Sequence, residues 1–355
     1  MARVNHFIKR FMLLNEFLSE WNNSSDKVLV RTSGSTGNPK PMWVEKRRME
    51  ASARLTCDFL GLSAGDTALL CMPLDYIAGK MVVVRSIVRN MRLISVKPSA
   101  RPFSTLSGPV DFAAVTPMQV YNTIKYPRER DIMAVTRHLI IGGGAIDNVL
   151  EEAIRSLPNP VWSTYGMTET LSHIALRRLN GPAADSWYTP FEGITTVIGD
   201  DGCLVINAPM LNPDVLYTND LAEMHPDGRR FRILGRKDNV IDSGGIKIRI
   251  EDVEKALSGH LAFPYMITKT KDACYGEIVV LLIAGNDVSA AKSVCESVLP
   301  HYWRPKAYLS VTRIPMTATG KPARAEGMRI AGKLLMGTDT CAKQYVLSWQ
   351  KLTHL

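Results

Sequence analysis

Hydroxyl, glycine and lysine side chains are concentrated in residues 32–40 (TSGSTGNPK), directly after a short apolar run at residues 27–31. Glycine lets the backbone approach a ligand closely, and consecutive loop N–H groups can form an anion-binding nest. The hydroxyls add donors and the lysine adds a positive charge, so the stretch predicts a loop that wraps a polyphosphate. A polar surface turn is the alternative interpretation. The predicted phosphate-binding residues are Thr32, Ser33, Gly34, Ser35, Thr36, Gly37 and Lys40.

Two further loops carry residue types that suit a nucleotide. Residues 142–145 (GGGA) follow a predicted strand at 138–141, and residues 165–170 (YGMTET) end a predicted strand at 161–165. In open α/β sheets, ligands bind beyond the carboxyl ends of the strands. The recurrence of such loops therefore favours a nucleotide site over unrelated surface turns.

The elements that must position these loops alternate between strands and helices. Such alternation predicts an α/β fold with mixed, largely parallel sheets. The expected strands are residues 27–31, 67–72, 93–96, 112–115, 138–141 and 161–165, and the expected helices are 6–21, 45–60, 81–88, 147–157 and one near Met118.

The pattern changes after residue 186, where short strands predict a small antiparallel sheet or barrel at 195–198, 202–207 and 231–234. A compact α+β pattern follows, with helices at 253–257 and 290–299 and strands at 278–284 and 307–311. We therefore expect an N-terminal domain over residues 1–237 and a smaller, mobile C-terminal lid domain over residues 238–355.

Composition limits the class of protein and of partner. The chain has 355 residues, is 46% hydrophobic and carries a net charge of +9, so a core and small polyanionic substrates are both expected. No nucleic-acid signature is visible, and no apolar run reaches transmembrane length. Six widely spaced cysteines without a CxxC motif predict reduced thiols and a cytoplasmic location.

Five motifs occur in order at residues 32–40, 165–169, 217–220, 235–238 and 315–321. Together they resemble the core motifs of the adenylate-forming superfamily, which contains acyl-CoA synthetases, peptide-synthetase adenylation domains and luciferases. Within this superfamily, the amino-acid sequences of residues 21–40, 73–80 and 165–177 are most similar to those of short o-succinylbenzoate–CoA ligases of menaquinone synthesis. Because only one predicted helix precedes residue 32, we expect a shortened N-terminal domain, for which a homodimer could cover the exposed surface.

The resemblance implies a role for each matching residue. Lys321 reaches the α-phosphate and the acid, Thr168 touches the α-phosphate, and Glu169 helps to hold Mg²⁺. Taken singly, Lys321 could be solvated and Glu169 could cap a helix. The residues implied around adenine and ribose are Gly143, Gly144, Ala145, Tyr165, Gly166, Asp220 and Arg236. Singly, Asp220 could be an ordinary turn residue.

The resemblance also implies a moving C-terminal domain, with Asp238 at the hinge and Gly244 and Gly245 beside the pantetheine arm of CoA. The lysine that assists adenylation would obstruct thioester formation if it stayed in place, so domain motion separates the two steps. The rival interpretation is that Arg236 and Asp238 form a surface ion pair of little energetic value.

The acid would be recognised by residues that lie apart from the nucleotide loops. o-Succinylbenzoate has two carboxylates, and the one that does not react needs a cation or several donors if it is buried. Arg85 is the expected anchor and Lys80 the alternative, although both could face water. Tyr76 stands where many relatives have histidine. His173 is expected to support the site or the core rather than to act as a base.

The sequence thus predicts an ATP-dependent acid–CoA ligase that adenylates an aromatic or dicarboxylic acid and then forms a thioester. ATP with Mg²⁺ and CoA are the expected cofactor and co-substrates, without nucleic-acid partners or stable membrane insertion. The alternatives are an adenylation enzyme that loads a carrier-protein thiol, a CoA ligase for another aryl acid, and a non-catalytic nucleotide-binding relative.

Overall fold

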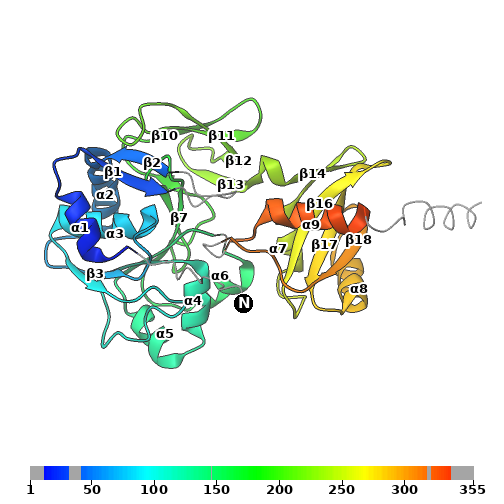
Figure 1. Cartoon of the computed structure of the whole chain (residues 1–355), viewed down its shortest axis with the longest axis horizontal. Helices are drawn as coiled ribbons and strands as arrows, with labels where there is room; N and C mark the ends of the chain where they lie inside the picture. Colours follow the sequence, from blue (N-terminus) through cyan, green and yellow to red (C-terminus); the bar gives the residue numbers. More distant parts are fainter. Residues whose placement is uncertain (1–11, 32–40, 145, 318–320, 337–355) are drawn as a thin grey trace, which may run out of the picture. The chain divides into compact units, whose positions relative to one another are not determined.

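The computed structural model describes residues 12–31, 41–144, 146–317 and 321–336 (Figure 1). The described residues form two compact units. The first contains those up to Thr218 together with Ala222–Ile233, and the second contains Asn219–Leu221 and those from Leu234 onward. The domain division at residues 237 and 238, and the hinge at Asp238, remain predictions.

A seven-stranded sheet with the order β4-β3-β5-β6-β7-β8-β9 is the centre of the first unit. Its first five strands are parallel, and the last two add antiparallel pairs. The strands are β3 (Thr67–Leu70), β4 (Arg92–Ser95), β5 (Phe112–Val115), β6 (His138–Ile141), β7 (Val161–Gly166), β8 (His173–Arg178) and β9 (Thr189–Pro190). This arrangement confirms the predicted α/β class.

Helices cover both faces of this sheet. The side chains of Ala68 and Leu70 pack into one apolar core with α1, α2 and α3, and Leu69 packs into the opposite core with α4, α5 and α6. Alternate burial of this kind follows from the period of two along a strand. The helices are α1 (Leu14–Trp21), α2 (Lys46–Leu60), α3 (Ile77–Arg89), α4 (Pro117–Ile124), α5 (Pro127–Ala134) and α6 (Asn148–Arg155).

The remaining strands up to Arg236 form two antiparallel sheets. One pairs β1 (Lys27–Arg31) with β2 (Pro41–Glu45), and the other has the order β10-β11-β12-β13. Its strands are β10 (Thr195–Ile198), β11 (Cys203–Asn207), β12 (Leu216–Met224) and β13 (Phe231–Arg236). The strand expected at residues 27–31 is confirmed, whereas β2, β8 and β12 were not anticipated. The helix expected from residue 6 begins, within the described residues, at Leu14.

The second unit is a five-stranded sheet with helices on both faces. Along β17, Val279, Leu281 and Ile283 pack with α7 and α8, while Val280 and Leu282 pack with α9. The strands are β14 (Val240–Ser243), β15 (Ile246–Arg249), β16 (Tyr265–Asp272), β17 (Gly276–Ala284) and β18 (Ala307–Val311). The helices are α7 (Ile250–Leu257), α8 (Val288–Val298) and α9 (Arg324–Met336), with short 3₁₀ turns at Lys237–Asn239 and His301–Trp303.

Among the described residues, no helix is both long and apolar enough to cross a membrane. The described cysteines are free thiols, in agreement with the reduced state expected from their spacing.

Candidate active site

The loop from β7 to β8 carries three of the predicted site residues: Gly166, Thr168 and Glu169. Gly166 lies where the β7–β8 register shifts. A Cβ atom added there would lie 2.3 Å from the carbonyl oxygen of Ser172 and 2.4 Å from Cα of His173. Glycine is therefore required because the two strands approach each other too closely for any side chain.

Hydrogen bonds within the loop hold Thr168 and Glu169 in place. The Thr170 hydroxyl accepts from the Met167 N–H at 3.0 Å and lies 2.7 Å from the Ser172 carbonyl oxygen. The buried Leu171 has a φ of 65°, a left-handed conformation that is rare for leucine and typical of functional loops. As a result Thr168 is buried and Glu169 is exposed.

Tyr165, the predicted adenine platform, belongs to an aromatic cluster. Its ring centroid lies 5.8 Å from that of Tyr188 and 5.2 Å from that of Phe231. The predicted adenine residues Gly143 and Gly144 are exposed after β6, which is the parallel neighbour of β7. Both elements therefore lie at the carboxyl end of the sheet, where a nucleotide is expected.

Several residues predicted to bind the nucleotide lie outside the described residues. They are Thr32, Ser33, Gly34, Ser35, Thr36, Gly37, Lys40 and Ala145.

Arg85 is the most deeply buried charged side chain near this loop. It lies on α3, is 2% exposed, and donates from Nη2 to the Ser172 hydroxyl at 2.6 Å. Its Nε is buried without a partner, and within the described residues no carboxylate lies within salt-bridge distance of the guanidinium. Burial lowers the pKa of Arg85 to about 10, so the group stays positively charged at neutral pH.

His173 completes this polar cluster as a neutral residue. Its Nδ1 lies 3.2 Å from the Ser172 hydroxyl, and its Nε2 lies 3.1 Å from the Thr56 hydroxyl on α2. Burial, together with the charge of Arg85, lowers the pKa of His173 well below its usual value. The histidine therefore orients Ser172 by hydrogen bonding and adds no second charge beside the arginine.

Lys80, the alternative acid anchor, is engaged elsewhere. Its Nζ lies 2.9 Å from Oε2 of Glu20 and donates to the carbonyl oxygen of Leu29 at 2.8 Å. A lysine already neutralised by a carboxylate is a poor site for a second one, so Arg85 is the better candidate. Tyr76 is the half-buried residue that precedes α3, and its side chain makes no capping hydrogen bond.

In the second unit, Arg236 bridges two predicted site residues. Its Nη1 donates to Asp220 at 3.1 Å, and its Nη2 donates to Asp238 at 2.9 Å. Lys321 lies in the same unit, where burial and then the charge of Arg236 lower its pKa. These four residues are thus brought together in the second unit, although Lys321 is far from the other three in the sequence.

Gly244 and Gly245 form the two-residue turn of the hairpin between β14 and β15. Their φ values of 61° and 83° are left-handed, as a tight hairpin turn requires. The backbone of this turn is accessible to a ligand, and the role in binding pantetheine remains a prediction.

Ser172 and Thr56 are polar groups of the site that the sequence did not reveal. Ser172 lies two residues after the motif at residues 165–170, a signal that could have suggested it. Thr56 lies within a helix with no distinguishing pattern. Only the packing of α2 against β8 brings its hydroxyl to His173.

No group of three or more potential metal ligands occurs among the described residues. The exposed carboxylate of Glu169 nevertheless fits Mg²⁺, because this ion usually takes one or two protein carboxylates and completes its shell with water and substrate phosphates. The residues present are therefore compatible with magnesium that arrives with a nucleotide.

The described residues form a two-unit α/β protein with its candidate site at the carboxyl end of the parallel strands. Residues 19–207 match the sequence model of the AMP-binding enzyme family. The chain belongs to the family of AMP-binding enzymes. The family assignment confirms the class predicted from the five motifs, an AMP-forming acyl-CoA synthetase.

Relatives and solved structures agree with this assignment. The chain is 25% identical over 333 residues to a 2-succinylbenzoate–CoA ligase of Listeria innocua, covering 86% of this chain and 70% of the relative. It is 32% identical to an AMP-forming acyl-CoA synthetase/AMP-acid ligase II-like protein of Dyadobacter fermentans, with a TM-score of 0.60 and coverage of 88% and 91%. The o-succinylbenzoate–CoA synthetase MenE of Bacillus subtilis, solved with ATP and magnesium, shares the fold at 22% identity, a TM-score of 0.69 and coverage of 84% and 69%.

Replacing Gly166 with alanine should lower the free energy of unfolding by about 1–3 kcal/mol, because the new methyl group meets the β8 backbone. Urea denaturation measures this loss. Gly108→Ala is the matched control, since a Cβ there meets nothing within 4 Å. Equal stabilities of the two variants would contradict the close approach.

The neutral His173 should make stability depend on pH. Its pKa is lowered in the folded protein, so below about pH 6.5 the unfolded chain binds a proton that the folded chain does not. The free energy of unfolding should therefore fall as the pH drops below 6.5, with a smaller slope in His173→Gln. Urea denaturation between pH 5 and 8 measures both slopes, and identical slopes would show that His173 is not the group responsible.

Proposed function

We propose that this AMP-forming acid–CoA ligase acts on o-succinylbenzoate, which it adenylates with ATP and then joins to CoA. The observation that carries the proposal is the buried guanidinium of Arg85, which has no acidic partner among the described residues. The names of the 2-succinylbenzoate–CoA ligases to which the chain is similar support the same acid.

A buried cation without a counter-ion is energetically unfavourable, because it has lost its water and gained no opposite charge. A substrate carboxylate would supply that charge and accept from the unpartnered Nε. Charge-assisted pairing of arginine with a carboxylate is strong and directional. Arg85 therefore favours an acid with a second carboxylate over a simple aryl or fatty acid.

The position of Arg85 relative to the loop suits an acid with two ends. Its partner Ser172 ends the loop that also carries Thr168 and Glu169. One carboxylate of the acid would lie at Arg85, while the other approaches the α-phosphate beside Thr168. The short, hydrogen-bonded loop would thus set the distance between the two ends of the substrate.

In the first step, the reacting carboxylate oxygen attacks the α-phosphorus of ATP and pyrophosphate leaves. Negative charge develops on the phosphate oxygens, so donors and cations must be placed beforehand. Thr168 would donate to the α-phosphate and Lys321 would supply positive charge. Magnesium, held in part by Glu169, neutralises phosphate charge when bound.

Other residues would hold the nucleotide and admit CoA. Tyr165 would stack on adenine, and Asp220 would accept from the ribose hydroxyls while Arg236 orients it. In the second step, the CoA sulfur attacks the acyl carbonyl of the adenylate and AMP leaves. The turn at Gly244 and Gly245 would adjoin pantetheine, with Asp238 as the hinge. A cytoplasmic location and a homodimer remain predictions.

The substrate is tested by AMP release with ATP and CoA across aryl, dicarboxylic and fatty acids. We expect o-succinylbenzoate to have the highest kcat/KM. Multiple turnovers of AMP release should require CoA. A better aryl or fatty acid would refute the substrate and leave the ligase class intact. Transfer to a carrier protein in preference to CoA would refute the acceptor.

Arg85→Met should raise the KM for o-succinylbenzoate about tenfold or more, because a charge-assisted hydrogen bond is lost. The KM for ATP should stay unchanged in ATP–pyrophosphate exchange. A monoacid that lacks the anchoring carboxylate and keeps the reacting one should be turned over equally by wild type and variant. Arg85→Lys, which restores a positive charge, should recover part of the affinity for the dicarboxylate. Unchanged kinetics with the dicarboxylate would disprove the anchor.

Lys321 should make adenylation sensitive to alkaline pH. Because burial lowers its pKa, the ammonium loses its proton below the ordinary lysine value of 10.5. The exchange rate should fall as the pH rises toward this lowered pKa. Lys321→Arg keeps its charge to higher pH, so the variant, scaled to its own maximum, should lack the alkaline loss. Identical alkaline limbs for both proteins would exclude Lys321 as the group that titrates.

A further inference from the structure

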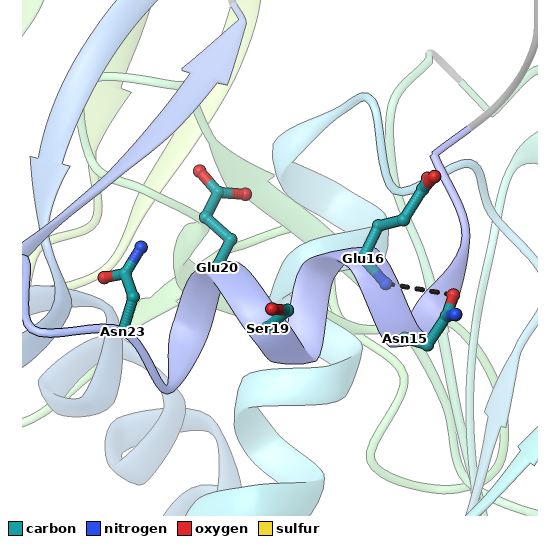
Figure 2. Close-up of a pocket in the computed structure, with 5 residues that line it drawn as sticks. All are labelled: Asn15, Glu16, Ser19, Glu20 and Asn23. Atoms are coloured by element: carbon teal, nitrogen blue, oxygen red, sulfur yellow. Dashed lines mark hydrogen bonds between the residues drawn. The ribbon is translucent and has the colours of Figure 1, made fainter.

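The ion pair between the buried Lys80 and the half-buried Glu20 has no role in the proposed reaction. Lys80 is 2% exposed on α3, and its Nζ lies 4.9 Å from the ring centroid of Phe17. Glu20 lies on α1 beside an open hollow of about 640 Å³ lined by Asn15, Glu16, Ser19, Glu20 and Asn23 (Figure 2). The carboxylate therefore reaches solvent, whereas the ammonium does not.

The pair holds both backbone polar groups of one residue in β1. The Leu29 N–H donates to Oε1 of Glu20 at 3.0 Å, and the Leu29 carbonyl accepts from Nζ of Lys80 at 2.8 Å. Among the described strands, β1 pairs only with β2. The two side chains thus do for the free edge of β1 what a neighbouring strand would do, and they satisfy groups that would be costly to leave unpaired.

Leu29 precedes Thr32, the first residue of the predicted phosphate loop, by three residues. A pair that holds Leu29 also restrains the end of β1, which is the last described element before the predicted loop. The helix that carries Lys80 carries Arg85 as well, so α3 connects the support of the ATP loop with the proposed acid anchor. Buried ion pairs often contribute little net stability. A role in positioning the end of β1 would therefore explain the pair better than stability does.

We propose that Glu20 and Lys80 are positioning residues that fix the end of β1 and thereby set the affinity for the phosphates of ATP. This inference rests on the proposed ATP-dependent function. Neither residue touches the reacting atoms, and their effect is transmitted through the backbone of Leu29.

The test measures the KM for ATP and the KM for the acid separately, by ATP–pyrophosphate exchange, with thermal unfolding of each variant. Lys80→Met should raise the KM for ATP about fivefold or more, because small displacements of a binding loop are costly. Glu20→Gln, which keeps an acceptor for the Leu29 N–H, should have a smaller effect in the same direction. The double variant should be no worse than Lys80→Met, since both changes remove one interaction.

The second unit provides a matched control. Lys269 there donates to the Val240 carbonyl at 2.7 Å and pairs with Glu277 at 3.1 Å, while Glu277 accepts from the Asp242 N–H at 3.0 Å. Lys269→Met removes a comparable pair that supports β14. It should lower the unfolding temperature and leave the KM for ATP in the exchange reaction unchanged.

Three outcomes overturn the inference. If the Lys80 and Glu20 variants lose stability with an unchanged KM for ATP, as Lys269→Met should, the pair is only structural. If Lys80→Met raises the KM for the acid instead, Lys80 binds the acid. If Lys269→Met raises the KM for ATP equally, the effect is not specific to β1. If the wild-type protein shows no ATP–pyrophosphate exchange, the proposed function itself fails. This failure is distinct from failure of the inference about the ion pair, because it is seen before any variant is compared.

Discussion

The buried guanidinium of Arg85, which has no carboxylate partner among the described residues, constrains the first unit. The Arg85 guanidinium has given up water and donates a close hydrogen bond to the Ser172 hydroxyl. The neighbouring histidine stays neutral, so no second charge competes with it. The arginine lies on α3, its Cζ is 6.0 Å from the ring centroid of Phe112 in β5, and Ser172 of the β7–β8 loop accepts its hydrogen bond. A ligand carboxylate would relieve the penalty that this burial imposes.

The same loop connects recognition of the acid with activation of the nucleotide. Gly166 lets β7 and β8 approach closely, the Thr170 hydroxyl closes the loop, and Leu171 accepts a strained backbone. Ser172 consequently accepts a hydrogen bond from Arg85, while Thr168 is buried and Glu169 is exposed in the same loop. Their roles at the α-phosphate and at magnesium are proposals. Strain of this kind persists where surrounding contacts determine the conformation.

Local patterns were sufficient for most of the fold. Apolar runs such as residues 112–115 and 138–141 correspond to β5 and β6, because buried parallel strands are short and almost entirely apolar. The same reasoning missed β8 and β12. Both strands contain charged residues, Arg177 and Arg178 in β8 and Asp220 and Glu223 in β12, so neither has the continuous apolar run that identified the others.

The sequence by itself determined the class of the protein, through five ordered motifs, and the residue types that could bind phosphate, ribose and acid. It favoured Arg85 over Lys80 as the anchor of the second carboxylate but did not name the partners of either, because a single sequence does not specify contacts across the fold. Tertiary structure decided those partners. It placed Glu20 beside Lys80 and left Arg85 with a serine, since contacts between residues distant in sequence depend on how α1, α3 and the β7–β8 loop pack together.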